Sequence, residues 1–289
     1  MDYVGILGLG LIFSVFVLGM IISFRFLGFA DLTIEGSFTL GGIIFASCLN
    51  SGLNPILCVI FVIVGGGLAG LFTAMLHCYV GINKLLAGIT TLTMLYTVNL
   101  RILGKSNMFL DNVHFFNQID NEFVELFIII GFALSVFVLL RLFLSTNFGL
   151  YLRATGENDV FVKNLKTNPK LFIIIGLTVA NAFIAFSGCL FCQYVGYSDI
   201  GSGQGMLVSM LAAMIIGENI VRPTTVTRQL LAAFGGAIVF QFLYSLALQL
   251  GVNPIDLKIL IGFLLIVFFV ITKYSYKGKP KKNIGADFL

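Results

Sequence analysis

The chain alternates long apolar runs with short polar stretches from end to end. Runs of about 18 or more apolar residues, such as 55–80, are long enough for a helix to cross the hydrocarbon core of a bilayer. They are continuous and do not alternate with period 2, which argues against the strands of a membrane β-barrel. We therefore predict an all-α, polytopic membrane protein with about nine transmembrane helices, at 3–24, 33–50, 55–80, 86–104, 124–145, 170–195, 204–221, 230–250 and 257–273.

Composition narrows the class of protein further. Hydrophobic residues make up 58% of the 289 residues and charged residues only 10%. No soluble fold of this size could cover such a chain with so few charges, which excludes soluble enzymes, soluble binding domains and disordered proteins. The net charge of +4 does not indicate nucleic-acid binding. The basic residues lie between apolar runs and in the C-terminal tail, where membrane topology explains them.

The distribution of Lys and Arg predicts the orientation. With the basic tail 274–289 in the cytoplasm and nine spans before it, 14 of the 17 Lys and Arg residues lie inside and 3 outside. The opposite orientation reverses these counts. Because positive loops stay inside, we predict a multi-pass plasma-membrane protein with its N-terminus outside and its C-terminus in the cytoplasm.

Two of the apolar runs, 33–50 and 204–221, are short and rich in Gly and Ser, so either could be broken or re-entrant. Each follows an Asp, at Asp31 and Asp199, and each leads to a long run with clustered glycines, a turn containing Asn, and a further apolar run. This order predicts an inverted internal repeat, which is typical of transporters with a substrate path at the repeat interface. The halves would be about 3–104 and 170–273, joined by a linker helix at 124–145. Chance similarity between Gly- and Ser-rich membrane segments is the alternative.

The longest predicted cytoplasmic loop, 146–169, contains three consecutive apolar residues, Val160, Phe161 and Val162. Asn158 or Asp159 is a suitable N-cap for a short helix over 159–166. An apolar ridge flanked by charges outside the membrane favours a docking surface. A helix that lies on the membrane surface is the alternative.

Within this loop, the stretch Gly149-Leu150-Tyr151-Leu152-Arg153-Ala154-Thr155-Gly156-Glu157-Asn158 resembles the cytoplasmic loop of ABC-importer permeases of the branched-chain amino acid and ribose type. In that group the loop leads into the coupling helix that sits in a cleft of the ATPase. Residues 31–38 and 87–102 resemble permeases for tryptophan, tyrosine and related substrates, and the resemblance covers most of 25–245. It implies ATPase coupling through Arg153, Gly156, Glu157, Asn158, Val160, Phe161 and Val162.

The resemblance also implies the partners. These are a second permease copy, two ATP-binding subunits and an external substrate-binding protein. The chain contains no GxxxxGK[ST] motif, so ATP and Mg belong to the ATPase, and this subunit is expected to be neither an enzyme nor a cofactor carrier. After Asn158 the residues Phe161-Val162-Lys163 depart from the family pattern, so the ATPase contact need not follow that pattern in detail.

Polar residues inside apolar runs are candidates for a substrate path. Thr93, Tyr96 and Asn99 follow one another at i, i+3 and i+6 and are expected to share one broad helix face. Capping is an alternative role for the Asp residues before the short helices, and Glu218 is expected at an interface or at the ATPase. The predicted path comprises Glu35, Ser37, Thr93, Tyr96, Asn99, Asp199 and Gln204.

Other reactive side chains do not form a recognisable site. Cys189 and Cys192 have CxxC spacing, but no second pair or nearby His accompanies them, so we interpret them as packing residues. His77 and His114 lack partners at metal spacing. The predicted function is the membrane-spanning permease subunit of an ATP-driven importer for a small solute, with an aromatic amino acid favoured. Alternatives are a nucleoside, sugar or branched-chain amino acid as cargo, or a carrier driven by an ion gradient; an intramembrane enzyme is disfavoured.

Overall fold

The computed structural model describes residues 3–110, 122–253 and 256–275. Every one of the nine predicted apolar segments contains a helix. Two short strands, β1 (Asn107–Phe109) and β2 (Tyr197–Asp199), pair antiparallel. The helices are α1 (Tyr3–Ile21), α2 (Thr33–Asn50), α3 (Pro55–Met75), α4 (Lys84–Leu103), α5 (Glu122–Ser145), α6 (Asn147–Glu157), α7 (Asp159–Asn164), α8 (Pro169–Val195), α9 (Met206–Val221), α10 (Val226–Gln249) and α11 (Leu257–Ser275), with π-helical turns at Ile22–Phe26 after α1 and Leu76–Val80 after α3.

Within the described residues, six helical segments are long and apolar enough to cross a membrane. They are Tyr3–Phe26, Pro55–Val80, Lys84–Leu103, Phe123–Ser145, Pro169–Val195 and Val226–Gln249. The all-α, polytopic class is thereby confirmed. The figure of nine transmembrane helices stays a prediction, because α2 contains Glu35 and several Gly and Ser residues and α9 has only 16 residues.

Asparagine side chains begin several of the helices. Asn54, Asn83 and Asn168 each accept a hydrogen bond from the backbone N–H two residues later, at the starts of α3, α4 and α8. Asn158 accepts from the N–H of Phe161 at the start of α7. The free N–H groups of a first helical turn need such acceptors. The predicted cap of the short helix in the loop 146–169 is therefore confirmed as Asn158, and that helix ends at Asn164.

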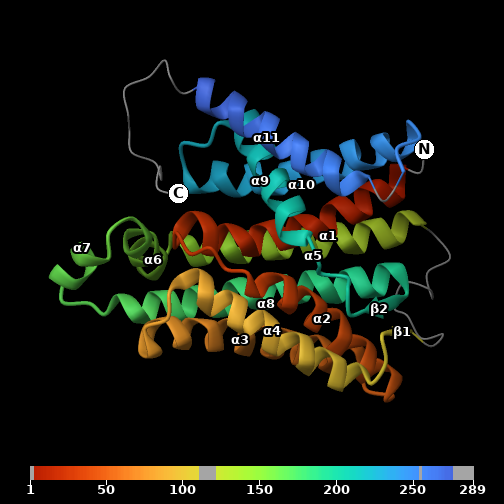
Figure 1. Ribbon diagram of the computed structural model, residues 1–289, viewed down its shortest axis with the longest axis horizontal. Helices are drawn as coiled ribbons and strands as arrows, with labels where there is room; N and C mark the ends of the chain where they lie inside the picture. The colour runs from red at the N-terminus through yellow and green to blue at the C-terminus, as the bar shows by residue number, and fades with distance from the viewer. Residues whose placement is uncertain (1–2, 111–121, 254–255, 276–289) are drawn as a thin grey trace.

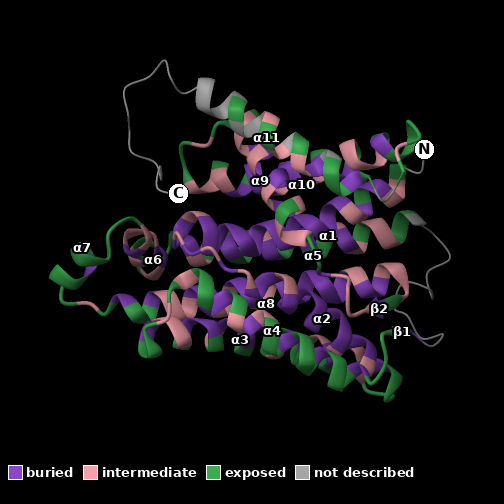
Figure 2. Ribbon diagram, viewed as in Figure 1, coloured by how far each residue is buried: buried purple, intermediate pink, exposed green. Residues whose placement is uncertain are grey.

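The helices form an elongated bundle around α1 and α8 (Figure 1). On one side of this pair lie α2, α3 and α4, and on the other lie α9, α10 and α11. The helices α6 and α7 project from one end of the bundle, and the β1–β2 pair lies at the opposite end. Helix α1 is buried along most of its length, whereas α3, α4 and α5 leave wide faces exposed (Figure 2).

Glycines allow the central helices to touch through their backbones. A Cβ atom added to Gly41 of α2 would lie 1.9 Å from the carbonyl oxygen of Ala185, and one on Gly188 of α8 would lie 1.9 Å from that of Phe38. Gly70 of α3 is similarly close to the Leu177 carbonyl oxygen, at 2.2 Å. Such contacts leave no room for a side chain, so these glycines act as packing residues between the helices.

Candidate functional site

A fully buried polar network anchors the start of α2. One carboxylate oxygen of Asp31 accepts the backbone N–H of Thr33 at 2.9 Å, and the other accepts the Nδ2 of Asn181 at 2.8 Å. The Oδ1 of Asn181 in turn accepts a hydrogen bond from the Ser37 hydroxyl at 2.7 Å. Because buried polar groups need partners, this network joins α2 to the middle of α8. Ser37, which we predicted in the substrate path, is fully buried in this network.

Three threonine hydroxyls extend the network towards α3 and α4. The Oγ1 atoms of Thr33 and Thr73 lie 2.7 Å apart, and that of Thr73 donates to Thr91 at 2.9 Å. All three side chains are buried. Neither this chain of hydroxyls nor Asn181 was predicted from the sequence, although an amide in an apolar run was a signal that could have identified Asn181.

Glu35 links the starts of the two short helices. Its Oε1 accepts the backbone N–H groups of Gly205 and Leu207 at 3.0 and 3.2 Å, so this carboxylate caps α9 from α2. The N–H of Gly203 donates to the Thr39 hydroxyl at 3.1 Å, which fixes the loop before α9 along α2. A carboxylate at a helix N-terminus satisfies free donors and complements the helix dipole. Gln204, in the same loop, is exposed.

The meeting point of α2 and α9 lies deep in the bundle. Asn181, which binds the Asp31 carboxylate before α2, is 12 residues beyond the start of α8, a distance of about 18 Å along a helix. Two residues into α2, Glu35 caps α9. The two short helices therefore begin near the centre of the long ones and not at an end of the bundle.

Helix α4 presents a mixed polar face that no other described helix covers. Tyr96 is 51% exposed, and Thr93 and Thr97 beside it are also exposed. Asn99 is only 2% exposed because it turns onto α2, where its Nδ2 donates to the Gly36 carbonyl oxygen at 3.4 Å. Within the described residues its Oδ1 has no hydrogen-bond partner. The prediction that Asn99 shares a face with Thr93 and Tyr96 is therefore wrong, since α4 packs on α2 along the residues that include Asn99.

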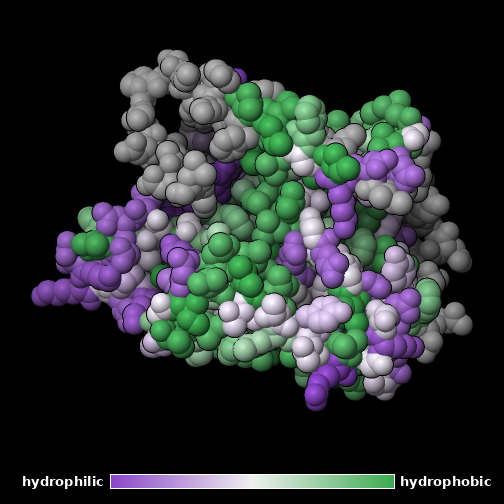
Figure 3. All heavy atoms as spheres, viewed as in Figure 1, coloured by the Kyte–Doolittle hydropathy of each residue, from purple (hydrophilic) through white to green (hydrophobic). Residues whose placement is uncertain are grey.

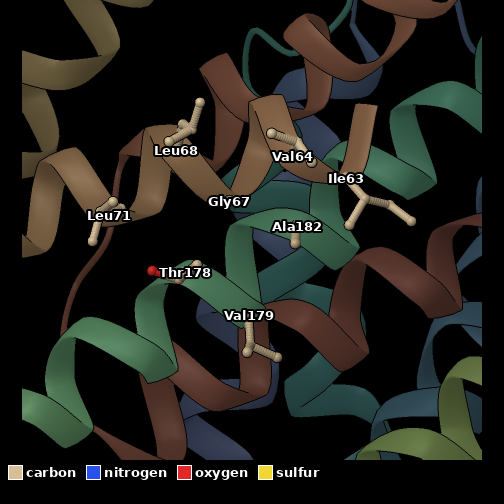
Figure 4. Close-up of a pocket in the computed structure, with 8 residues that line it drawn as sticks. All are labelled: Ile63, Val64, Gly67, Leu68, Leu71, Thr178, Val179 and Ala182. Atoms are coloured by element: carbon tan, nitrogen blue, oxygen red, sulfur yellow. The ribbon is translucent and has the colours of Figure 1, made fainter. Parts of the chain in front are cut away.

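Two cavities of about 290 Å³ differ in chemistry. The first is an apolar groove between α3 and α8, shown in Figure 4, and its Thr178 hydroxyl already donates to the Ile174 carbonyl oxygen. The second lies beside β2 and is lined by Phe191, Tyr197, Ser198 and Asp199 among others. Polar groups that converge with aromatic ones are typical of a ligand site. The second cavity therefore resembles a ligand site more than the first does, and the place of Asp199 on a substrate path stays a prediction.

The loop between α5 and α8 forms the projecting end of the molecule. Val160 and Phe161 of α7 are 56% and 54% exposed, whereas Val162 is buried against the rest of the loop. The apolar ridge therefore excludes Val162, contrary to our prediction, and Leu165 joins it at 48% exposure. Hydrophilic residues surround this end in Figure 3. The hydrogen bond from Lys163 to Asp159, at 2.7 Å, lowers the pKa of that carboxyl group and closes one turn of α7.

Of the other residues that we predicted for ATPase coupling, Gly156 holds this loop against the bundle. The guanidinium of Arg153 donates from Nε to the Gly149 carbonyl oxygen at 3.2 Å, within α6. A Cβ on Gly156 would lie 2.0 Å from the carbonyl oxygen of Phe26, so α6 rests directly on the chain that leaves α1. Glu157 and Asn158 are exposed at the turn between α6 and α7.

Comparison with known proteins gives one family. Residues 3–270 match the family described as "Branched-chain amino acid transport system / permease component". The chain belongs to this permease family. It is 36% identical to the "Tyrosine transport system permease protein" of Clostridioides difficile (strain R20291) over 287 residues, which cover 96% of both chains. It is 33% identical to an uncharacterized protein of Rickettsia prowazekii (strain Madrid E) over 87% of this chain and 90% of that one. No solved structure matches.

Membership of the family confirms the resemblance derived from the cytoplasmic loop. The protein is a multi-pass membrane permease of a transport system, and the matched region contains both short helices and the projecting loop. Among the residues that the structure describes, no three His, Cys, Asp or Glu side chains lie together as metal ligands would. The buried polar groups around Asp31 and Asn181 instead join helices to one another.

Proposed function

We propose that this protein is the membrane-spanning subunit of an ATP-driven ABC importer for a small solute that is an amino acid, with an aromatic amino acid favoured. The observation that carries the proposal is α7, a short capped helix that projects beyond the bundle with Val160 and Phe161 exposed. A carrier driven by an ion gradient has no need of such a helix. The family match and the tyrosine-system relative support the same assignment and the choice of cargo.

An inverted repeat accounts for the packing of the two halves. If α1 to α4 correspond to α8 to α11, the packing of α3 on α8 is repeated as α10 on α1, and that of α2 on α3 as α9 on α10. The packing of α2 on α4 likewise recurs as α9 on α11. These matched pairs support a two-fold relation between halves that begin their short helices near the bundle centre.

The end of the bundle that carries α7 faces the cytoplasm in this proposal. Arg25, Lys84 and Lys170 lie at that end: Lys84 donates to the Gly28 carbonyl oxygen, and Lys170 begins α8 directly after α7. Arg101 and Lys105 lie at the opposite end, near β1. The clustering of basic residues at the α7 end supports a cytoplasmic C-terminus, although the tail 274–289 lies almost wholly outside the described residues.

The substrate path requires a second copy of the permease. The open face of α4, with Thr93, Tyr96 and Thr97, would lie against the same face of the partner and line a polar passage. Two ATP-binding subunits, which carry ATP and Mg, would dock on the two α7 helices, and an external binding protein would deliver the cargo. Selectivity would then depend mainly on the binding protein, because Thr93, Tyr96 and Thr97 offer hydroxyls and carry no charge.

The test of this proposal is purification from the native host through a tag on the permease. We expect an ATPase and a binding protein to co-purify and tyrosine uptake into proteoliposomes to require ATP. Phe161→Asp should abolish ATPase association, because it places a charge in a desolvated contact. Lys166→Glu, an exposed change of charge in the same loop, is the control. A solitary carrier that moves its cargo without ATP would refute the proposal, and uptake of nucleosides or sugars instead of tyrosine would correct the cargo.

A further inference from the structure

Helix α9 is held at both ends by side chains from one short segment of the other half, residues 25–35. At its start, Glu35 accepts the N–H groups of Gly205 and Leu207. At its end, the guanidinium of Arg25 donates two hydrogen bonds to the carboxylate of Glu218. The bond from Nε to Oε1 is 2.7 Å long. The segment 25–35 therefore sets the position of α9 along its own axis.

Helix α9 is in turn fixed to α10. A Cβ on Gly217 of α9 would lie 1.9 Å from the Ala232 carbonyl oxygen, and one on Gly236 of α10 would lie 2.3 Å from that of Ala213. Backbones in such close contact move together, because closely packed protein interiors have low compressibility and transmit strain. A displacement of α9 is therefore a displacement of the α9–α10 pair.

The same segment also contacts the loop of α6 and α7, which docks the ATPase in the proposed function and is called the docking loop below. Gly156 of α6 lies against the carbonyl oxygen of Phe26, next to Arg25. Leu27 packs on Gly176 of α8, and a Cβ atom added to Gly176 would lie 2.7 Å from the Cδ1 atom of Leu27. Arg25 and Phe26 belong to the π-helical turn Ile22–Phe26, an irregularity that often marks functional positions in helices. A movement of α6 would thus act directly on the backbone that carries Arg25.

We infer that Arg25, Glu218 and Glu35 form a relay that transmits movement of the docking loop to the α9–α10 pair. The inference rests on the proposed function, because α7 must receive the ATPase for the relay to have an input. A bidentate Arg–carboxylate contact fixes the relative orientation of the two side chains as well as the distance between them. The side chains of Arg25 and Glu218 are 28% and 16% exposed, so the pair is accessible enough to be remade during a cycle without unfolding the bundle.

The test measures coupling and not only activity. Wild type and variants are purified with their co-purifying ATPase, reconstituted with the binding protein, and assayed for ATP hydrolysis and for uptake of tyrosine as the probe. We expect Arg25→Gln and Glu218→Gln to hydrolyse ATP at close to the wild-type rate but to import at least about five-fold less tyrosine per ATP. The exchange Arg25→Glu with Glu218→Arg should recover at least half of the lost coupling. Arg228→Gln, which removes an exposed charge on α10, should leave the ratio unchanged.

Two further variants test the geometry of the Arg25 contact and the cap that Glu35 provides. Arg25→Lys retains the charge but loses the bidentate contact. Its ratio of tyrosine uptake to ATP hydrolysis should therefore be intermediate, even if Arg25→Gln does not assemble with the ATPase. Glu35→Ala, which removes the cap of α9, should lower the ratio as well. Unchanged tyrosine uptake per ATP in Arg25→Gln and Glu218→Gln, in complexes that retain the ATPase, would overturn the relay alone. Absence of any ATPase from the wild-type preparation would overturn the proposed function and the relay with it.

Discussion

The buried contact between Asp31 and Asn181 offers the sharpest test of what holds the two halves together. Both Asp31 oxygens accept N–H groups, as a carboxylate does, and one of the two donors is the Asn181 amide. Asn181→Leu keeps a similar volume but removes this donor and the acceptor of the Ser37 hydroxyl. A group left buried and unsatisfied costs more than the average hydrogen bond gains.

Besides the bond from Asn181 to the Leu177 carbonyl oxygen within α8, Asn181→Leu removes two bonds between chain segments, and these two contribute unequally to the expected loss of stability. A hydrogen bond to a charged group contributes about 1.5–3 kcal/mol, whereas a neutral bond between membrane helices averages about 0.6 kcal/mol. We therefore expect Asn181→Leu to lower the free energy of unfolding by about 3 kcal/mol. Ser37→Ala, the matched control that removes only the neutral bond, should cost about 1 kcal/mol or less. The carboxylate accounts for most of the difference.

A double-mutant cycle measures the contribution of the carboxylate. Asp31→Asn in the Asn181→Leu background removes the buried charge, so it should recover about 1–2 kcal/mol. The assay is unfolding of the purified permease in detergent by titration with SDS, read by far-UV circular dichroism. If Asn181→Leu costs no more than Ser37→Ala, or if Asp31→Asn makes it worse, the carboxylate does not dominate the network and the reasoning fails.

Three further predictions concern capping, the path and topology. Glu35→Gln keeps an acceptor for the N–H groups of Gly205 and Leu207, so it should retain tyrosine uptake and lower the free energy of unfolding by only a few tenths of a kcal/mol. Glu35→Ala should lower that free energy by about 1 kcal/mol. Equal loss of uptake in both variants, measured in proteoliposomes, would favour a direct contact of the Glu35 charge with cargo. Tyr96→Leu should slow uptake of a panel of amino acids and nucleosides uniformly without lowering stability. Asn99→Leu should act instead through the packing of α4 on α2. A changed order of substrate preference in Tyr96→Leu would place selectivity in α4. A cysteine at Asn283 should resist membrane-impermeant thiol reagents in intact cells, and its labelling from outside would reverse the proposed orientation.

Much of the fold could be predicted because local forces decide it. Apolar runs of sufficient length become helices wherever their backbone groups must be satisfied internally. Caps such as Asn158 depend only on residues two or three positions away, so the short helix before α8 was correctly predicted. The family resemblance likewise depended on contiguous stretches, above all 149–158, and the comparisons confirmed it.

The contacts of the candidate site, in contrast, join residues that are far apart in the chain. Arg25 and Glu218 are 193 residues apart, and Glu35 meets the start of α9 about 170 residues later. No helical periodicity reveals which of several polar residues faces a neighbouring helix, which is why Asn99 turned onto α2 while Tyr96 stayed exposed. The sequence by itself determined the helices, their caps and the family of the permease. Only the tertiary structure decided which polar groups bind one another, because burial and hydrogen bonding between helices depend on how the helices pack.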